Sequence, residues 1–177
     1  MNERMVEAWN AVVLPTDEVW YLGDFSLSKK ALVYVARLNG VKHLVPGNHD
    51  HCFPFNNRTR AALDRSKKQY LDAGFATIAE SPVVTEIGGE SVRLWHLPYA
   101  TPAGDHAPYE LRYLEYRPQD DGMWLLCGHV HNAWRINGRM INVGVDAWGM
   151  RPVSEQEVSD IITNPPRVAL TVFDHVD

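Results

Sequence analysis

The chain has 177 residues, of which 45% are hydrophobic, so it is large enough for one domain, residues 1–177, with a buried core. Its formal net charge of -5 excludes binding of nucleic acids through overall positive charge and leaves only a local basic patch for that role. No apolar run approaches the roughly 18 residues of a membrane span, and the residues after Met1 lack a signal-peptide pattern, so we expect a cytoplasmic protein that does not enter membranes.

The first part of the chain predicts a helix followed by a strand, helix, strand unit. Apolar residues on one helical face predict a helix over residues 1–13. Two short apolar runs, 19–22 and 41–45, each stop at a glycine turn, and helical periodicity lies between them over 28–39. A unit of this kind places two parallel strands side by side.

The rest of the chain mixes helices with strands and hairpins. Asn137-Gly138 and Gly88-Gly89 are hairpin turn signals, and Ser154-x-x-Glu157 is a capping box that begins the last helix. A loop over 97–109 with three prolines is expected to be ordered and close to a site. The remaining elements are a helix over 59–72 and strands over 75–79, 83–87, 91–95, 123–127, 134–136, 139–141 and 168–173. This mixture predicts an α/β fold with some antiparallel pairing.

Polar side chains follow several predicted strands at the point where each strand ends. Because the carboxyl ends of parallel strands meet at one edge of a sheet, these side chains have a route to one pocket. If the Gly-His-x-His segment stays extended, both of its imidazoles lie on the same side, which suits two neighbouring metal ions or one metal and one substrate contact. The residues concerned are Asp24, Asn48, His49, Asp50, His96, His129 and His131.

The motifs Gly-Asp, Gly-Asn-His-Asp, a lone His and Gly-His-x-His, in this order over residues 20–144, resemble those of the calcineurin-like metallophosphoesterases. The resemblance implies a sandwich of mixed sheets flanked by helices and a dinuclear metal centre. It implies hydrolysis of a phosphomonoester or phosphodiester, with a phosphorylated small molecule or a nucleotide as substrate. Nitrogen and oxygen ligands without thiolate suit Mn, Fe, Zn or Co and do not select one of them.

The resemblance also assigns roles to the metal ligands. It implies that Asp24 bridges two divalent ions and that Asn48, His96 and His129 complete one of the two sites. His131 would belong to the other site. Cations are needed because an anionic phosphoester resists nucleophiles until its charge is neutralised.

Two further residues are implied to serve catalysis. His49 would act on the phosphate, either by protonating the leaving oxygen or by stabilising the transition state. Asp50 would orient His49.

The Asp-x-His motif with which the family begins is missing from this chain, whose first histidine, His43, lies after Asp24. We therefore expect a shortened form that lacks the first strand of the fold and has one incomplete metal site, with impaired catalysis. A non-catalytic metal- or phosphate-binding relative is the alternative. A third hypothesis is nucleic-acid binding by the basic stretch 58–68, for which a solvated helix face is the favoured interpretation. The sequence predicts no oligomeric state.

Overall fold

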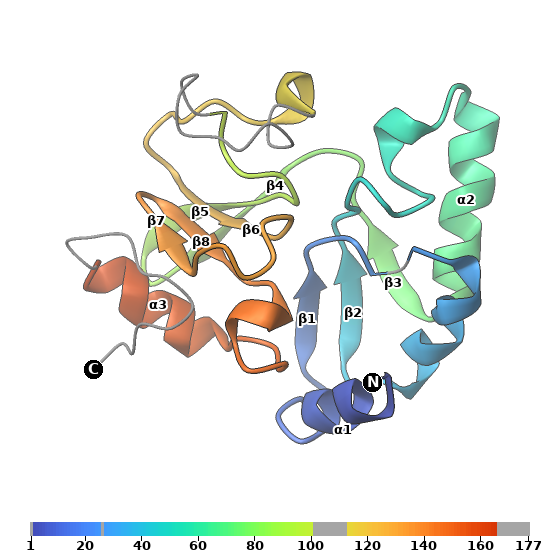
Figure 1. Cartoon of the computed structure of the whole chain (residues 1–177), viewed down its shortest axis with the longest axis horizontal. Helices are drawn as coiled ribbons and strands as arrows, with labels where there is room; N and C mark the ends of the chain where they lie inside the picture. Colours follow the sequence, from blue (N-terminus) through green and yellow to red (C-terminus); the bar gives the residue numbers. More distant parts are fainter. Residues whose placement is uncertain (1, 26, 101–112, 166–177) are drawn as a thin grey trace.

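The structure is a computed structural model that describes residues 2–25, 27–100 and 113–165. Its first sheet has three parallel strands in the order β1-β2-β3, formed by Glu18–Tyr21, Val41–Leu44 and Phe75–Ile78. Helix α1 (Asn2–Asn10) lies at the base of this sheet, and α2 (Arg60–Ala73) lies along its outer side (Figure 1). The predicted strand, helix, strand unit with parallel strands is confirmed.

The second sheet is mixed and has five strands in the order β4-β5-β6-β8-β7. Its hairpins pair β4 with β5 and β7 with β8 antiparallel, whereas β6 runs parallel to both β5 and β8. Helix α3 (Glu155–Thr163) packs against β4. The strands are β4 (Val83–Ile87), β5 (Glu90–Leu94), β6 (Trp124–Cys127), β7 (Ile136–Asn137) and β8 (Met140–Asn142). The α/β class with mixed sheets and helices is confirmed at this level.

The helix predicted over 28–39 forms as a 3-10 helix, η1 (Lys29–Arg37), rather than an α-helix. The β-branched residues Val33 and Val35 lie within it, and side chains of this kind lower α-helical propensity. Three shorter 3-10 helices are η2 (Pro54–Asn56), η3 (Leu114–Tyr116) and η4 (Val145–Ala147). The strand predicted over 168–173 lies outside the described residues, as does most of the loop predicted over 97–109.

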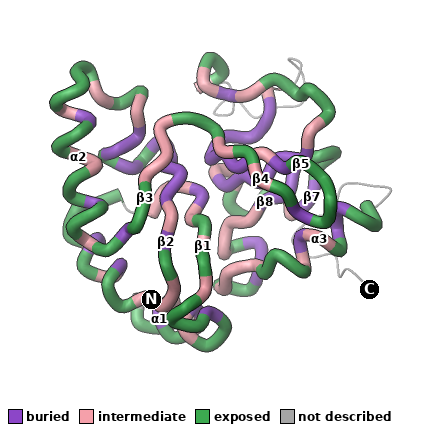
Figure 2. Tube along the Cα trace, turned by 180° about the vertical axis from the view of Figure 1, so that it is seen from behind, coloured by how far each residue is buried: buried purple, intermediate pink, exposed green. Residues whose placement is uncertain are grey.

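The buried apolar side chains form two hydrophobic clusters. The larger is built on the second sheet and includes Leu94, Leu125 and Ile141, each at most 2% exposed. The smaller, around Val35 and Tyr70, joins the first sheet to η1 and α2. Buried stretches of the chain accordingly gather in the second sheet and in β2, whereas β1 is only partly covered (Figure 2). In the described ranges no helix is both long enough and apolar enough to cross a membrane.

The predicted capping box at the start of α3 is confirmed and gives a stability prediction. Ser154 accepts from the Glu157 backbone N–H, and Glu157 accepts from Ser154 and from Arg151 at 2.6 Å. The hydrogen bond from Arg151 lowers the pKa of Glu157 from 4.5 to about 2 and outweighs burial, which by itself would raise that pKa. Glu157→Ala should lower the free energy of unfolding by about 1 kcal/mol at pH 7, because both the cap and a partly exposed ion pair are lost.

The same pair predicts how this difference varies with pH. Because the carboxyl pKa of Glu157 is depressed in the folded chain, its contribution is complete above pH 4.5 and is lost as the pH falls through about 2. Urea unfolding at pH 7 and near pH 2 measures both values. Glu155→Ala, in the same helical turn, is the matched control. A difference between the Glu157 variant and the unaltered chain that persists near pH 2 would contradict the assignment.

Candidate metal centre

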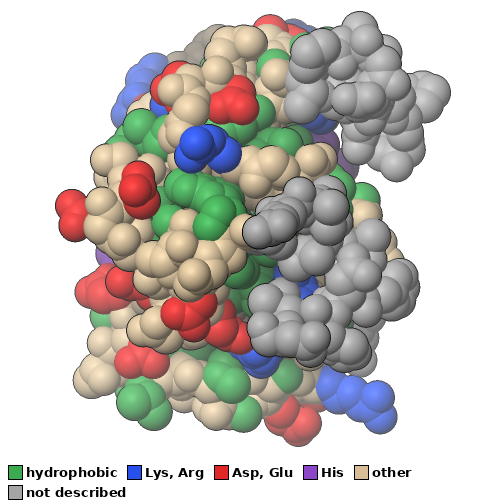
Figure 3. Space-filling view, turned by 90° about the vertical axis from the view of Figure 1, so that its left-hand side faces the viewer, with side chains coloured by type: hydrophobic (Ala, Val, Ile, Leu, Met, Phe, Trp, Pro, Cys, Tyr) green, Lys and Arg blue, Asp and Glu red, His purple; other side chains and the backbone are tan. Residues whose placement is uncertain are grey.

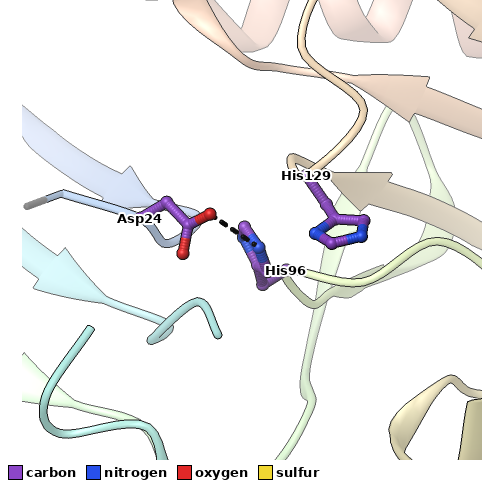
Figure 4. A group of neighbouring side chains, drawn as sticks. All are labelled: Asp24, His96 and His129. Atoms are coloured by element: carbon purple, nitrogen blue, oxygen red, sulfur yellow. Dashed lines mark ion pairs between the residues drawn. The ribbon is translucent and has the colours of Figure 1, made fainter. Parts of the chain in front are cut away.

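Four side chains from four loops meet at the carboxyl ends of the strands. Asp24 follows β1, Asn48 follows β2, His96 follows β5 and His129 follows β6. Donor atoms of the aspartate and of both histidines all lie within 4.8 Å of one another. Figure 4 shows the carboxylate and the His96 ring facing each other, with the His129 ring beside them. The sequence prediction that these four residues converge is confirmed, and their role as ligands stays a prediction.

The orientation of His96 fits a metal ligand. Its Nδ1 lies 2.8 Å from the carbonyl oxygen of Leu22, which can only accept, so this ring nitrogen carries the proton. In the neutral ring the other nitrogen, Nε2, then has a lone pair that faces Asn48 Oδ1 at 3.0 Å and Asp24 Oδ2 at 3.3 Å. A nitrogen lone pair and the oxygen atoms that it faces repel one another unless a proton or a cation lies between them. A backbone carbonyl that fixes the tautomer is typical support for a metal-binding histidine.

The charge states of the other ligands also suit a cation. Burial and the nearby His96 lower the pKa of His129 to about 4, so its imidazole is neutral at pH 7. Its Nδ1 lies 2.9 Å from Asn48 Oδ1. Burial by itself would raise the pKa of Asp24, but His96, when its ring is protonated, and the backbone N–H of His49 lower it overall. The group therefore presents one carboxylate, one amide oxygen and neutral imidazole nitrogen, a set that divalent ions bind.

The backbone is strained at the same place. Five non-glycine residues in the described ranges have positive φ, and Asp24, His129 and His131 are three of them, at 54°, 70° and 50°. The left-handed conformation costs roughly 1–2 kcal/mol for such residues. Strain of this kind gathers at functional sites, where the surrounding structure holds it in place.

Glycines allow the strand ends to approach one another. A methyl group added at Gly47 would lie 2.2 Å from Asp24 Oδ1, and one added at Gly23 would lie 2.5 Å from the Gly47 nitrogen. Gly23 also has a φ of 88°, which disfavours any other residue. The two glycines thus let the loops after β1 and β2 bring Asp24 and Asn48 together.

A buried hydrogen-bond network holds the loop after β2. Asp50 is fully buried and accepts from the Gly47 backbone N–H at 2.9 Å and from the Tyr70 hydroxyl at 3.2 Å. Asn56 donates to the Asn48 carbonyl oxygen at 2.8 Å. These contacts fix the loop from α2 and η2, and sequence patterns gave no sign of Tyr70 in this role. The predicted orienting of His49 by Asp50 stays a prediction.

His49 lies at the rim of the group. Its backbone N–H donates to Asp24 Oδ1 at 2.9 Å, which ties it to the carboxylate, and the residue as a whole is exposed. An exposed imidazole held next to the candidate ligands can reach a molecule bound there.

The segment that carries His129 and His131 is not extended, so the condition under which both imidazoles would lie on the same side is not met. Both residues have left-handed backbones, so the segment turns between them. His131 has a side chain that is 78% exposed, and its Nδ1 lies 3.4 Å from Asp146 Oδ2. Asp146, in η4, was not among the predicted ligands, although it follows a hairpin close to the Gly-His-x-His turn. His131, Asp146 and Asp24 line one cleft.

The basic stretch on α2 is largely paired with acidic groups. Arg60 and Lys67 both contact Glu80, and Lys68 lies 2.7 Å from Asp72. Acidic side chains also predominate over basic ones on the visible part of the face that carries α3 (Figure 3). The ion pairs of Arg60, Lys67 and Lys68 agree with the interpretation of α2 as a solvated helix face.

The fold and the site together define an α/β protein with a candidate divalent-cation centre at the carboxyl ends of its strands. The chain shares 34% identity over 173 residues with the Gene 66 protein of Mycobacterium phage L5, covering 92% of this chain and 81% of the phage protein. With the Gene 66 protein of Mycobacterium phage D29 it shares 36% identity over 171 residues, covering 89% and 83%. The chain belongs to the family of these phage Gene 66 proteins.

One solved structure supports the fold. A protein of unknown function from Aquifex aeolicus superposes with a TM-score of 0.59 and 25% identity, covering 90% of this chain and 84% of that one. An archaeal phosphodiesterase superposes with a TM-score of 0.45 and 20% identity, covering 81% of this chain and 74% of that one. A phosphopantetheinyl hydrolase from Mycobacterium tuberculosis superposes with a TM-score of 0.45 and 14% identity, covering 98% of this chain and 90% of that one. No family model matches the chain.

Proposed function

We propose that the chain is a metal-dependent phosphoesterase in which Asp24, Asn48, His96 and His129 hold a divalent cation. The observation that carries the proposal is the His96 ring, whose protonated Nδ1 is taken by the Leu22 carbonyl while Nε2 faces two oxygen atoms. The resemblance of the motifs to calcineurin-like metallophosphoesterases supports the reaction class. A cation bound here would neutralise the charge of a phosphoester and activate water for its hydrolysis.

The protein's own residues supply the rest of the chemistry. His49, exposed and tied through its backbone to Asp24, donates a proton to the leaving oxygen or stabilises charge on the phosphate. Asp50 and Tyr70 keep the loop that carries His49 and Asn48 in place. The substrate is a phosphomonoester or phosphodiester of a small molecule or nucleotide.

The test is Mn²⁺-dependent hydrolysis of bis-p-nitrophenyl phosphate and p-nitrophenyl phosphate. His49→Ala should lower turnover by about 10²–10⁴-fold and leave Mn²⁺ affinity unchanged, because the imidazole acts on the phosphate and not on the cation. His51→Ala is the matched control, since His51 is also exposed and its backbone, not its imidazole, makes the hydrogen bonds to Tyr70 and Asn57. Equal turnover in the His49 and His51 variants would contradict the proposed role.

A non-catalytic relative that binds metal or phosphate is the second candidate. The observation in its favour is that His131 lies outside the four-residue group, largely exposed and next to Asp146. A dinuclear centre would need further ligands beside Asp24. Binding of about one ion per chain, without hydrolysis in a folded sample, would favour this candidate, and about two ions with turnover would exclude it.

A further inference from the structure

Asn142, the last residue of β8, is fully buried although its side chain is a polar amide. Burying an amide is unfavourable unless its donors and its acceptor find partners. The side-chain nitrogen donates to the carbonyl oxygens of His131 at 2.7 Å and of Trp134 at 2.8 Å. The side-chain oxygen accepts from the Gly144 backbone N–H at 3.0 Å. All three bonds are made to the backbone, so this side chain constrains the path of the chain around it.

The backbone of Asn142 is itself held at a fixed point of the second sheet. Its N–H donates to the Arg135 carbonyl at 2.9 Å, and its carbonyl accepts from the Trp148 indole at 2.7 Å. Because β8 runs parallel to β6, Asn142 lies beside Cys127, directly before the Gly-His-x-His turn. The amide thus reaches this turn from an anchored position.

The turn that Asn142 contacts carries two residues of the predicted site in strained conformations. His129 and His131 have left-handed φ values of 70° and 50°. Before His129, the Gly128 N–H ties the turn to the His96 carbonyl at 3.0 Å. After His129, the side chain of Asn142 holds the His131 carbonyl. Since strained backbone persists only where its surroundings hold it, the two anchors together account for the position of His129.

The same amide also links the two residues that lie beside the four candidate ligands. His131 Nδ1 lies 3.4 Å from Asp146 Oδ2. Asp146 lies in η4, which begins directly after Gly144. Because Asn142 bonds to His131 through its nitrogen and to Gly144 through its oxygen, one side chain fixes both segments.

We propose that Asn142 is a positioning residue of the candidate metal centre, which holds the turn so that the His129 ring stays beside His96 and Asn48. Without the two donated bonds, the backbone of the turn relaxes from its left-handed conformation. The His129 Nδ1, now 2.9 Å from Asn48 Oδ1, then leaves the group. The role of His129 as a ligand rests on the proposed function, whereas the position of its ring is a property of the metal-free chain.

Asn142→Leu tests the proposal, because leucine has similar size and branching but neither donates nor accepts hydrogen bonds. The ring centroids of His96 and His129 lie 5.2 Å apart, so nuclear Overhauser contacts between these rings are expected in the unaltered, metal-free chain. The variant should lose these contacts. Its Mn²⁺ affinity, measured by calorimetric titration, should fall about 10–100-fold, which is typical when the support of a metal-binding histidine is removed.

Ring contacts that persist in folded Asn142→Leu would overturn the proposal. So would equal Mn²⁺ affinity of this variant and the unaltered chain. If the unaltered chain binds no Mn²⁺, the proposed function fails, and the ring contacts alone still decide whether Asn142 positions His129.

Asn39→Leu is the matched control. The Asn39 side chain also donates to a backbone carbonyl, that of Val13 at 3.0 Å, but Asn39 precedes β2 and lies at the opposite end of this strand from Asn48. This variant should keep the ring contacts and the Mn²⁺ affinity. Equal loss of the ring contacts in both variants would reduce the role of Asn142 to general stability and would overturn the proposal.

A measurement on the unaltered chain needs no variant, which matters if Asn142→Leu does not fold. Both side-chain amide protons of Asn142 should exchange with solvent at least about 100-fold more slowly than those of exposed amides, because both are bonded and buried. They should also show scalar couplings across the hydrogen bonds to the His131 and Trp134 carbonyls. Rapid exchange, or slow exchange without these couplings, would overturn the proposal.

Discussion

Asp24→Asn should lower the affinity for Mn²⁺ by at least about 100-fold while leaving the protein folded. Asp24 is the only carboxylate among the four candidate ligands, so the substitution removes all of the formal negative charge from the group. Asparagine has nearly the same size, can still accept from the His49 backbone N–H and tolerates the left-handed backbone at this position. The expected loss of Mn²⁺ affinity therefore reports on the charge beside the cation and not on the fold.

Calorimetric titration with Mn²⁺ measures the affinity, and thermal unfolding without metal measures the fold. Asp72→Asn is the matched control, because it removes the same charge from an exposed ion pair on α2. Equal Mn²⁺ affinity in the two variants would contradict the assignment of Asp24 as a ligand.

Gly47→Ala should disrupt the same centre through packing alone. The added methyl group would lie 2.2 Å from Asp24 Oδ1 and 2.4 Å from the Asp24 nitrogen, so both the side chain and the backbone of Asp24 must move. Overpacking of this kind costs about 1–3 kcal/mol of the free energy of unfolding. Because the displaced carboxylate is a candidate ligand, Mn²⁺ affinity should fall as well.

Gly122→Ala separates these two effects. Gly122 has a φ of 87° and nothing within 4 Å of an added methyl group, so alanine there introduces backbone strain without a collision. This control should lose about 1 kcal/mol of stability and keep its Mn²⁺ affinity. If Gly47→Ala binds Mn²⁺ as tightly as Gly122→Ala does, Asp24 is not held in place for a cation by the loop after β2.

The positions of the candidate ligands could be predicted because they depend on strand ends. Asp24 and Asn48 end two parallel strands, and His96 and His129 follow strands of the second sheet that are themselves parallel neighbours. Apolar runs and glycine turns mark such ends in the sequence. Hence the convergence of these four residues followed from local patterns and one topological rule.

Contacts made by the backbone and by distant loops could not be predicted in this way. The Leu22 carbonyl that fixes the His96 tautomer carries no side-chain signal, and Tyr70 reaches Asp50 from a helix 20 residues away. The direction of His131 depends on a left-handed φ of 50°, which no residue pattern in the sequence marks. Periodicity also cannot distinguish η1 from an α-helix when the apolar spacing is similar.

The left-handed residues at the candidate centre have a consequence for protein engineering. Asp24, His129 and His131 each hold the backbone in a conformation that glycine or asparagine adopts more easily. Laboratory evolution that rewards resistance to heat alone would therefore favour their replacement early, well before residues of the apolar core. A variant library selected in that way would accumulate thermostable chains that lack the candidate ligands, and only a parallel screen for cation binding would retain these residues.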